Sequence, residues 1–188
     1  MVGTDMRSLT LCLAVLLLPL LAAGCASPGV SVSGLKDERE RQVRVDTAAY
    51  QDHSELGLGI HGPEWHLRGT VGKDTRVAFH QIYLRTGAPQ RRRWDEATAV
   101  VDGALVHLDV ETVDSSPRCS EFGCIYLEDT VIRVEEAHLR HWAEAGGTIQ
   151  LVSSLAEKAH LDLSLDGAEA RQEIDKYLES FQDARSAI

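Results

Sequence analysis

Two cysteines, Cys119 and Cys124, have the spacing in this sequence that most directly indicates covalent chemistry. Four residues, Ser-Glu-Phe-Gly, separate them. In an oxidising compartment such a pair usually forms a disulfide, and a loop this short contributes about 2 kcal/mol by the loop-entropy estimate. A redox-active pair or half of a metal site are the alternatives, but the spacing is not Cys-x-x-Cys and no second cysteine pair exists. We expect a structural disulfide that pins a turn.

Histidines near carboxylates are the second group with potential chemistry. His138 and His141 lie at i and i+3 with Glu135 nearby, so a helix would place them on one face. A zinc site needs further ligands, and none matches this pair. His107 and Asp109 alternate on the polar face of an expected strand, where solvation is the simpler interpretation. The sequence therefore predicts no metal site.

The only basic cluster in the chain is followed directly by a tryptophan. It consists of Arg91, Arg92, Arg93 and Trp94. These are candidate interaction residues that would contact a phosphate or a lipid head group, with Trp94 near an interface. The alternative, which we favour, is a solvated loop whose tryptophan folds back into the core.

Enzyme and cofactor motifs are absent or stand in unsuitable places. Gly57–Gly62 spells G-x-G-x-x-G, but Pro63 follows where a dinucleotide fold opens a helix, and no acid stands near position 80. Ser33–Lys36 matches Ser-x-x-Lys without the companion motifs. No cofactor is predicted. A hydrolase stays open as a minor alternative, because catalytic triads are assembled in space and leave no fixed spacing.

The beginning of the chain indicates export. Leu9–Leu21 is an apolar run preceded by Arg7. It has the length and polarity order of a secretory signal peptide, it is shorter than the roughly 20 residues of a membrane-spanning helix, and Pro19 near its end disfavours such a helix. We therefore expect residues 1–24 to be removed.

The end of this run, Leu21-Ala-Ala-Gly-Cys25, resembles the lipobox of bacterial lipoproteins. The resemblance implies that Cys25 is lipidated and becomes the new N-terminus, and two or more acyl chains anchor a protein stably. Ala26 is similar to the default residue for export to the outer membrane. We expect a lipid-anchored protein of the outer membrane that faces the periplasm. The inner membrane and the cell surface stay open, as does a secreted protein with a chance cysteine.

Composition limits the partners. The net charge of −10 makes nucleic acid a poor partner. Residues 25–44 combine small flexible residues with a dense charge run and read as a lipidated N-terminus and tether. Residues 45–188 are long enough for one globular domain. The expected partners are the membrane, through the lipid, and an envelope protein.

From Val43 onward, short β-type segments alternate with turn signals. The expected strands are 43–45, 55–60, 76–85, 97–101, 104–113, 125–134, 148–153 and 158–165, and the expected helices are 135–145 and 167–184. Asp102-Gly103 predicts a type I′ hairpin, and Asp166 is placed to cap the last helix. That helix has an apolar stripe for the core or, alternatively, for a partner: Ala170, Ile174, Tyr177, Leu178 and Phe181.

These elements predict a mainly β (α+β) domain, either an antiparallel sandwich or a barrel-like sheet, with a short helix and a C-terminal helix. The Cys-x4-Cys turn, the acidic strand after it and the closing Tyr-Leu-x-x-Phe helix are similar to uncharacterised proteobacterial lipoproteins. That resemblance implies location and fold. We expect a non-catalytic envelope lipoprotein that binds a protein or an envelope component; a small-ligand carrier, with a cavity between sheet and helices, is the alternative.

Overall fold

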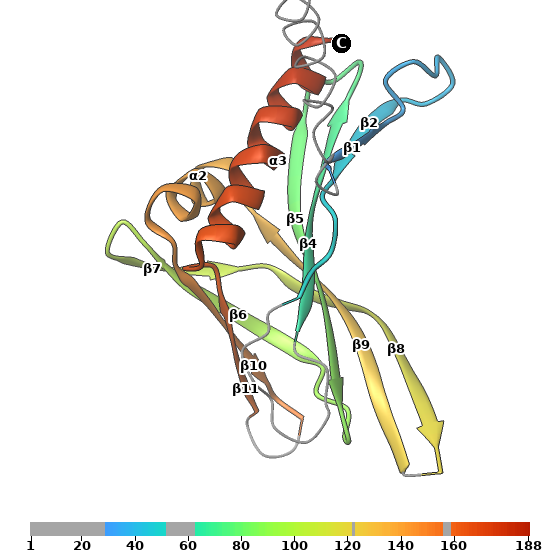
Figure 1. The fold of residues 1–188 in the computed structure, drawn as a ribbon, viewed down its shortest axis with the longest axis vertical. Coiled ribbons are helices and arrows are strands. Elements are labelled where there is room, and N and C mark those ends of the chain that lie inside the picture. The colour runs from blue at the N-terminus through green and yellow to red at the C-terminus, as the bar shows by residue number, and fades with distance from the viewer. Residues whose placement is uncertain (1–28, 52–62, 122, 156–158) are drawn as a thin grey trace, which may run out of the picture.

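The computed structural model describes residues 29–51, 63–121, 123–155 and 159–188. They form two antiparallel sheets and two helices (Figure 1). In chain order the elements are β1 (Ser31–Ser33), β2 (Gln42–Asp46), β3 (Tyr50–Gln51), β4 (Glu64–Gly72), β5 (Ala78–Ala88), β6 (Trp94–Val101), β7 (Ala104–Leu108), β8 (Val110–Ser120), β9 (Gly123–Val134), α2 (Glu136–Ala145), β10 (Thr148–Ser153), β11 (His160–Ser164) and α3 (Ala168–Ser186). The predicted mainly β fold with two such helices is confirmed.

The two sheets face each other as a sandwich, and neither closes into a barrel within the described ranges. The larger one, sheet A, has the strand order β1-β2-β4-β5-β9-β8, with β3 beside β4. The smaller one, sheet B, has the order β11-β10-β6-β7. The chain therefore passes from sheet A to sheet B between β5 and β6, and returns between β7 and β8.

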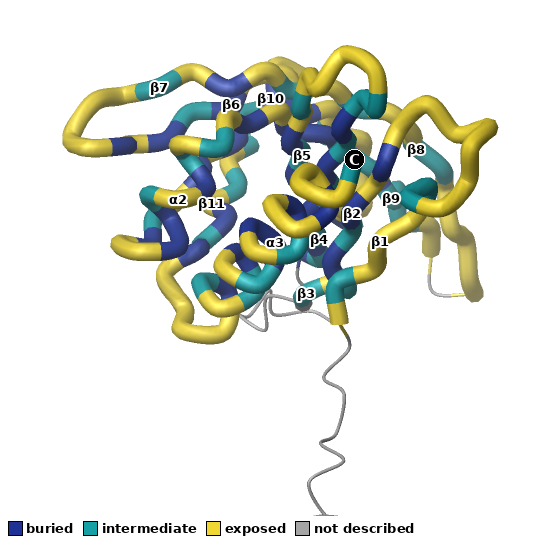
Figure 2. Tube along the Cα trace, turned by 90° about the horizontal axis from the view of Figure 1, so that it is seen from above, coloured by how far each residue is buried: buried dark blue, intermediate teal, exposed yellow. Residues whose placement is uncertain are grey.

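Sheet A has one buried face, which we call its inner face. Burial alternates along β4, whose inward positions include Trp65 and Leu67, and along β5, whose inward positions run from His80 to Thr86. This is the pattern of a sheet packed on one side. Figure 2 shows the buried positions gathered in the centre of the molecule. The start of β5 contacts α3 through His80 and Tyr177, whereas its end contacts sheet B through Thr86 and Trp94.

The hairpin of β6 and β7 forms as predicted. Asp102 and Gly103 have φ angles of 52° and 78°, the left-handed pair that a type I′ turn requires. The expected strand 104–113, however, is two strands. β7 ends at Leu108 in sheet B and β8 begins at Val110 in sheet A, so the chain changes sheet at Asp109.

The predicted tether extended too far into the folded part. Within residues 25–44, β1 pairs with β2, and β2 pairs with β4 in turn. Val43 and Val45 are fully buried members of the core, because β2 has the alternating pattern of a strand with one face inward. The signal segment, Cys25, the expected strand 55–60 and the Gly57–Gly62 motif lie outside the described residues.

α3 lies on the inner face of sheet A and buries its whole predicted apolar stripe. The helix approaches β4 closely at Gly69: a Cβ atom there would lie 2.2 Å from the hydroxyl of Tyr177 and 2.5 Å from the ring of Phe181. The stripe is therefore core, and it is not free for a partner. The predicted cap was wrong, since the helix begins at Ala168 after Gly167 and has no side-chain cap.

Candidate ligand-binding cavity

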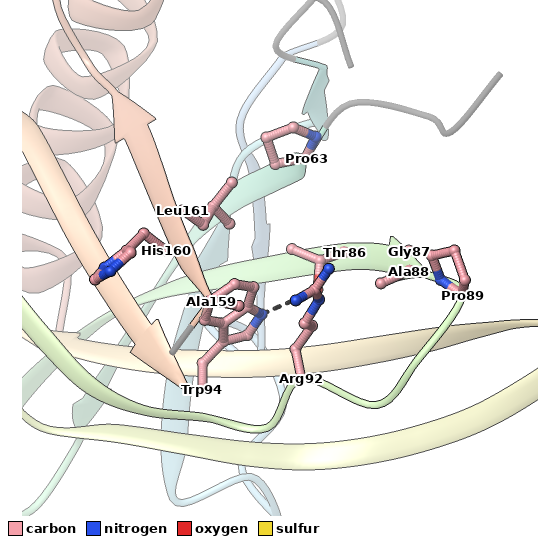
Figure 3. A pocket seen from close by; sticks show the side chains of 10 residues that line it. All are labelled: Pro63, Thr86, Gly87, Ala88, Pro89, Arg92, Trp94, Ala159, His160 and Leu161. Carbon is pink, nitrogen blue, oxygen red and sulfur yellow. Dashed lines mark hydrogen bonds between the residues drawn. The ribbon is translucent and has the colours of Figure 1, made fainter. Parts of the chain in front are cut away.

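A cavity of about 310 Å³ lies where the two sheets separate, at the end of β5 (Figure 3). Residues from both sheets line it: Pro63, Thr86, Gly87, Ala88, Pro89, Arg92, Trp94, Ala159, His160 and Leu161. Most of these side chains are apolar. A cavity of this kind, with few polar groups, is the usual form of a small-molecule site. It lies between the sheets and not between a sheet and the helices, where the carrier alternative placed it.

Trp94 forms one wall of this cavity. The residue is only 5% exposed, and its indole Nε1–H donates a hydrogen bond to Thr86 Oγ1 at 3.1 Å. This bond satisfies the polar edge of the ring and fixes its orientation. The indole thus joins the first strand residue of β6 to the inner face of β5, and a flat apolar surface faces the cavity.

The loop before Trp94 is held by its backbone. The side chain of Glu128, on β9, is 2% exposed and accepts hydrogen bonds from the backbone N–H groups of Arg92 and Arg93 at 2.9–3.2 Å. The carbonyl oxygen of Arg92 accepts a hydrogen bond from the hydroxyl of Ser153. Bonds from N–H groups to a carboxylate are among the stronger hydrogen bonds in proteins. These hydrogen bonds therefore fix the backbone of the loop, and they do not involve the side chains of its arginines.

The three arginines of the predicted cluster differ in their exposure and in their neighbours. Arg91 is exposed, with its guanidinium 5.8 Å from the centre of the Tyr126 ring. Arg93 is exposed and has a φ of 46°. Arg92 is half-buried and lines the cavity, and among the described residues its guanidinium has no carboxylate within ion-pair distance. Within the described ranges, the cavity thus combines largely apolar walls with a guanidinium group that has no ion-pair partner.

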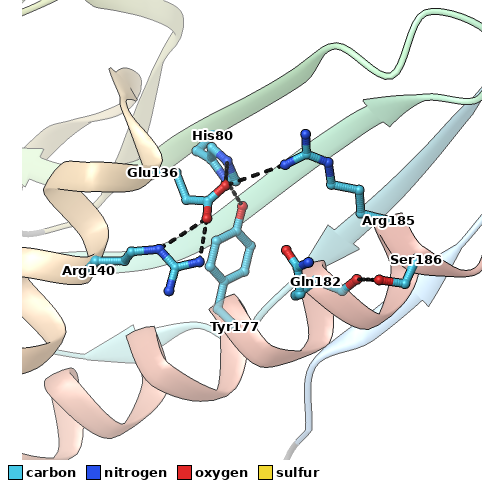
Figure 4. A network of polar contacts seen from close by, with 7 residues as sticks. All are labelled: His80, Glu136, Arg140, Tyr177, Gln182, Arg185 and Ser186. Carbon is cyan, nitrogen blue, oxygen red and sulfur yellow. Dashed lines mark hydrogen bonds and ion pairs between the residues drawn. The ribbon is translucent and has the colours of Figure 1, made fainter.

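A second polar cluster lies at the other end of β5, beneath the helices (Figure 4). His80 is 5% exposed, and its Nδ1 lies 2.7 Å from the hydroxyl of Tyr177. Its Nε2 has no hydrogen-bond partner among the residues that the structure describes, and it lies 3.8 Å from Glu136. Glu136 in turn binds Arg140 and lies 3.9 Å from Arg185. Burial lowers the pKa of His80 and raises the pKa of Tyr177.

This cluster borders a wider hollow of about 760 Å³, whose walls include Phe79, Arg133 and Glu136. Two of the charged side chains of these walls have partners: Glu136 binds Arg140, and Arg133 lies 3.6 Å from Glu111. The third, Glu135, is an acid that would disfavour an anionic ligand here. His80 packs its ring on Phe181 at 4.4 Å between centroids. The cluster therefore fastens α2 and α3 to sheet A.

The two histidines on α2 do not share a site. His141 Nδ1 lies 2.9 Å from Asp102 in the β6–β7 turn, whereas His138 packs against Trp142. In the ranges that the structure describes, no three residues of the His, Cys, Asp and Glu types gather around a point that would hold a metal. The exposed His107 lies on β7, and Asp109 follows that strand.

The predicted disulfide partners meet at the tip of a projecting hairpin. Cys119 and Cys124 are register partners of β8 and β9, and their sulfur atoms lie at bonding distance. β5 pairs with β9 only as far as Tyr126, so residues 118–121 and 123–125, which we call the β8–β9 arm, extend beyond the rest of sheet A (Figure 1). The disulfide therefore pins the turn of an exposed hairpin.

Sequence reasoning singled out only Arg92 and Trp94 among the residues that line the cavity, and it missed both Thr86 and the supporting Glu128. Glu128 follows the alternation of Ile132 and Val134 on β9, which would have marked it as an inward acid. Thr86 gave no such signal, because a threonine near a strand end is common.

Comparisons with known proteins return no similarity: no protein-family model, curated protein or solved structure matches the chain. Within the described residues, neither helix combines the length and hydropathy needed to cross a bilayer. The function is therefore inferred from the sequence and the geometry of the chain itself.

Proposed function

We propose that the protein is an envelope lipoprotein, held at the outer membrane through Cys25, whose domain binds a small envelope component. The binding site would be the cavity of about 310 Å³ between the two sheets, which we call the Trp94 cavity after the residue that forms one of its walls. The observation that carries this proposal is the cavity between the two sheets. Its volume of about 310 Å³ falls at the lower end of the roughly 300–1,000 Å³ typical of small-molecule sites. Export and lipidation are supported by the sequence of residues 9–25.

The ligand part of the proposal is tested by filling the cavity. Ala88 is half-buried and lines it, so Ala88→Phe should occupy the space and remove binding. Ala104→Phe is the matched control, because Ala104 is exposed on β7 and is not part of the lining. Native mass spectrometry of protein extracted mildly from its own envelope should show an added mass for the parent and for Ala104→Phe. Its presence on Ala88→Phe would contradict the proposal.

The anchor is tested separately by Cys25→Ser. Without the thiol no lipid can be attached, so the variant should leave the membrane fraction and appear in the periplasmic fraction. Cys12→Ser is the control, because Cys12 lies in the segment that we expect to be removed. Retention of Cys25→Ser in the membrane would overturn the lipoprotein assignment and leave the cavity assignment untouched.

A protein partner is the second candidate function, and the β8–β9 arm is the observation that favours it. Both faces of the arm are exposed at its tip, and a stapled hairpin presents a rigid edge for recognition. A photo-crosslinking amino acid that replaces Arg118 should capture one protein in cells. The same amino acid in place of Val100, which is exposed on sheet B, should not capture it. Equal labelling from both positions would argue against the arm.

A further inference from the structure

We infer that the Trp94 cavity selects a medium-chain carboxylate, an apolar chain of about ten non-hydrogen atoms that ends in one carboxylate group, and that Arg92 recognises this group. The inference rests on the proposed ligand-binding function and adds the class of ligand.

The charge of the ligand follows from Arg92. Its half-buried guanidinium lines an otherwise largely apolar cavity, and attraction between charges is stronger at such a site than in bulk water. A guanidinium presents a planar set of donors that matches a carboxylate with two parallel hydrogen bonds. The whole chain carries a net charge of −10, so general electrostatics would repel an anion. Preference for an anion would therefore have to come from a local cation.

The fixed loop strengthens this assignment. The bonds from the Arg92 and Arg93 N–H groups to Glu128, together with the Ser153 contact, hold the backbone on both sides of the Arg92 Cα atom. A side chain that starts from a fixed backbone loses less freedom when it binds a ligand. Glu128 is thus a positioning residue, and the ligand contact itself belongs to Arg92.

The size and apolar character of the ligand follow from the walls. A volume of about 310 Å³ holds about ten non-hydrogen atoms, at roughly 30 Å³ for a water-sized unit. The indole of Trp94 and the side chains of Leu161 and Pro89 offer apolar surface to an aliphatic chain (Figure 3). Octanoate has the matching size and charge.

Isothermal titration of the lipidated protein in nanodiscs of zwitterionic lipid tests the inference, with empty nanodiscs as the blank. The probes are octanoate, 1-octanol and octyl phosphate. Octanoate should bind roughly tenfold more tightly than 1-octanol, as expected for one charge-assisted contact. Arg92→Gln should reduce this ratio to about one, and Arg92→Lys should restore part of it. Arg93→Gln, an equal charge change on the neighbouring exposed residue, should leave the ratio unchanged.

The outcomes separate the two proposals. Equal binding of octanoate and 1-octanol by the parent protein would overturn the carboxylate inference, whereas ligand binding in the cavity would stand. Tighter binding of octyl phosphate than of octanoate would also overturn it, in favour of a phosphate ligand. Binding of none of the probes would overturn the inference, while an envelope-derived mass lost only in Ala88→Phe would still support the ligand-binding function. An octanoate preference that survives Arg92→Gln would overturn the role of Arg92.

Discussion

The two ends of β5 bury the same face of the same strand in different ways. At its start, His80 packs under α3 against Tyr177 and Phe181, and it also borders the wider hollow of about 760 Å³. At its end, Thr86 meets Trp94 of sheet B, and a cavity stays open beside them. Each end thus contains a buried polar pair beside an open space. The cavity at the end of β5 lies between the two sheets and has mainly apolar walls, whereas the hollow at its start lies beside α2 and has charged walls that include Arg133, Glu135 and Glu136.

The difference comes from the element that covers the sheet. A helix presents a narrow apolar stripe and can come very close where the strand has a glycine, as α3 does at Gly69. Two sheets twist, so the layers separate toward their corners unless large side chains fill the gap. Here the corner residues include Gly87 and Ala88, which are small. The cavity is therefore a consequence of sheet-on-sheet packing with small residues at one corner.

Alanine at the two glycines should give the largest contrast in stability. Gly69→Ala places a methyl group 2.2 Å from the Tyr177 hydroxyl, and such overpacking typically costs 1–3 kcal/mol; we expect about 2–3 kcal/mol less free energy of unfolding. Gly87→Ala meets its nearest atom at 3.4 Å and should be neutral or stabilising by up to about 1 kcal/mol. Urea denaturation measures both. Equal effects would show that the two ends are packed alike.

Glu128 and Asp129 provide the second contrast, on one strand. Glu128→Gln replaces an acceptor of backbone N–H groups by an amide, and loss of hydrogen bonds to a buried charged group costs about 1.5–3 kcal/mol. Asp129 lies on the outer face and pairs with Arg85, so Asp129→Asn should cost less than about 1 kcal/mol. Denaturation of both variants tests the order. A larger loss for Asp129→Asn would remove the anchoring role of Glu128.

The pH dependence of stability should show the smallest contrast and belongs to the helix-covered end. Burial lowers the pKa of His80 below its ordinary value of 6.5; Arg185 and Arg140 add to this effect, and Glu136 opposes it. The unfolded chain therefore takes up a proton near pH 6.5 while the folded chain does not. The free energy of unfolding should be independent of this group above about pH 7 and should fall as the pH drops through 6.5.

His80→Gln should flatten that fall between about pH 7 and pH 5.5, as measured by urea denaturation at several pH values. His66 is the control: burial also lowers its pKa, but it lies half-buried on the outer face beside Tyr83. Its replacement by glutamine should flatten the curve less. A greater effect of His66→Gln would place the pH sensitivity on the outer face.

The local parts of the fold were predictable from the sequence. The hairpin at Asp102-Gly103 depends on two residues that accept positive φ, and the stripe on α3 follows the helical period. The Cys119–Cys124 turn follows from spacing alone. These features involve neighbours in the chain, so their physical causes are visible in short windows.

Contacts between distant residues were not predictable in the same way. His80 and Tyr177 are 97 residues apart, and Glu128 binds a loop 35 residues before it. Nothing in the alternation of residues 104–113 marked Asp109 as the point where the chain changes sheet, because both halves keep a strand pattern. The cavity depends on such long-range contacts, those of Glu128 and Trp94 among them, so the sequence indicated Arg92 and Trp94 only as members of a cluster.

The edges of sheet A bear on how copies of the chain behave when they are crowded together. β8 is one edge, and an open strand edge can pair with another molecule and start aggregation. Its register shifts between Thr112 and Asp114, and Pro117 has no N–H group to donate. The opposite edge, β1, has only three residues. Both edges are thus poor templates for strand pairing, which would keep copies of the folded domain apart at high local concentration.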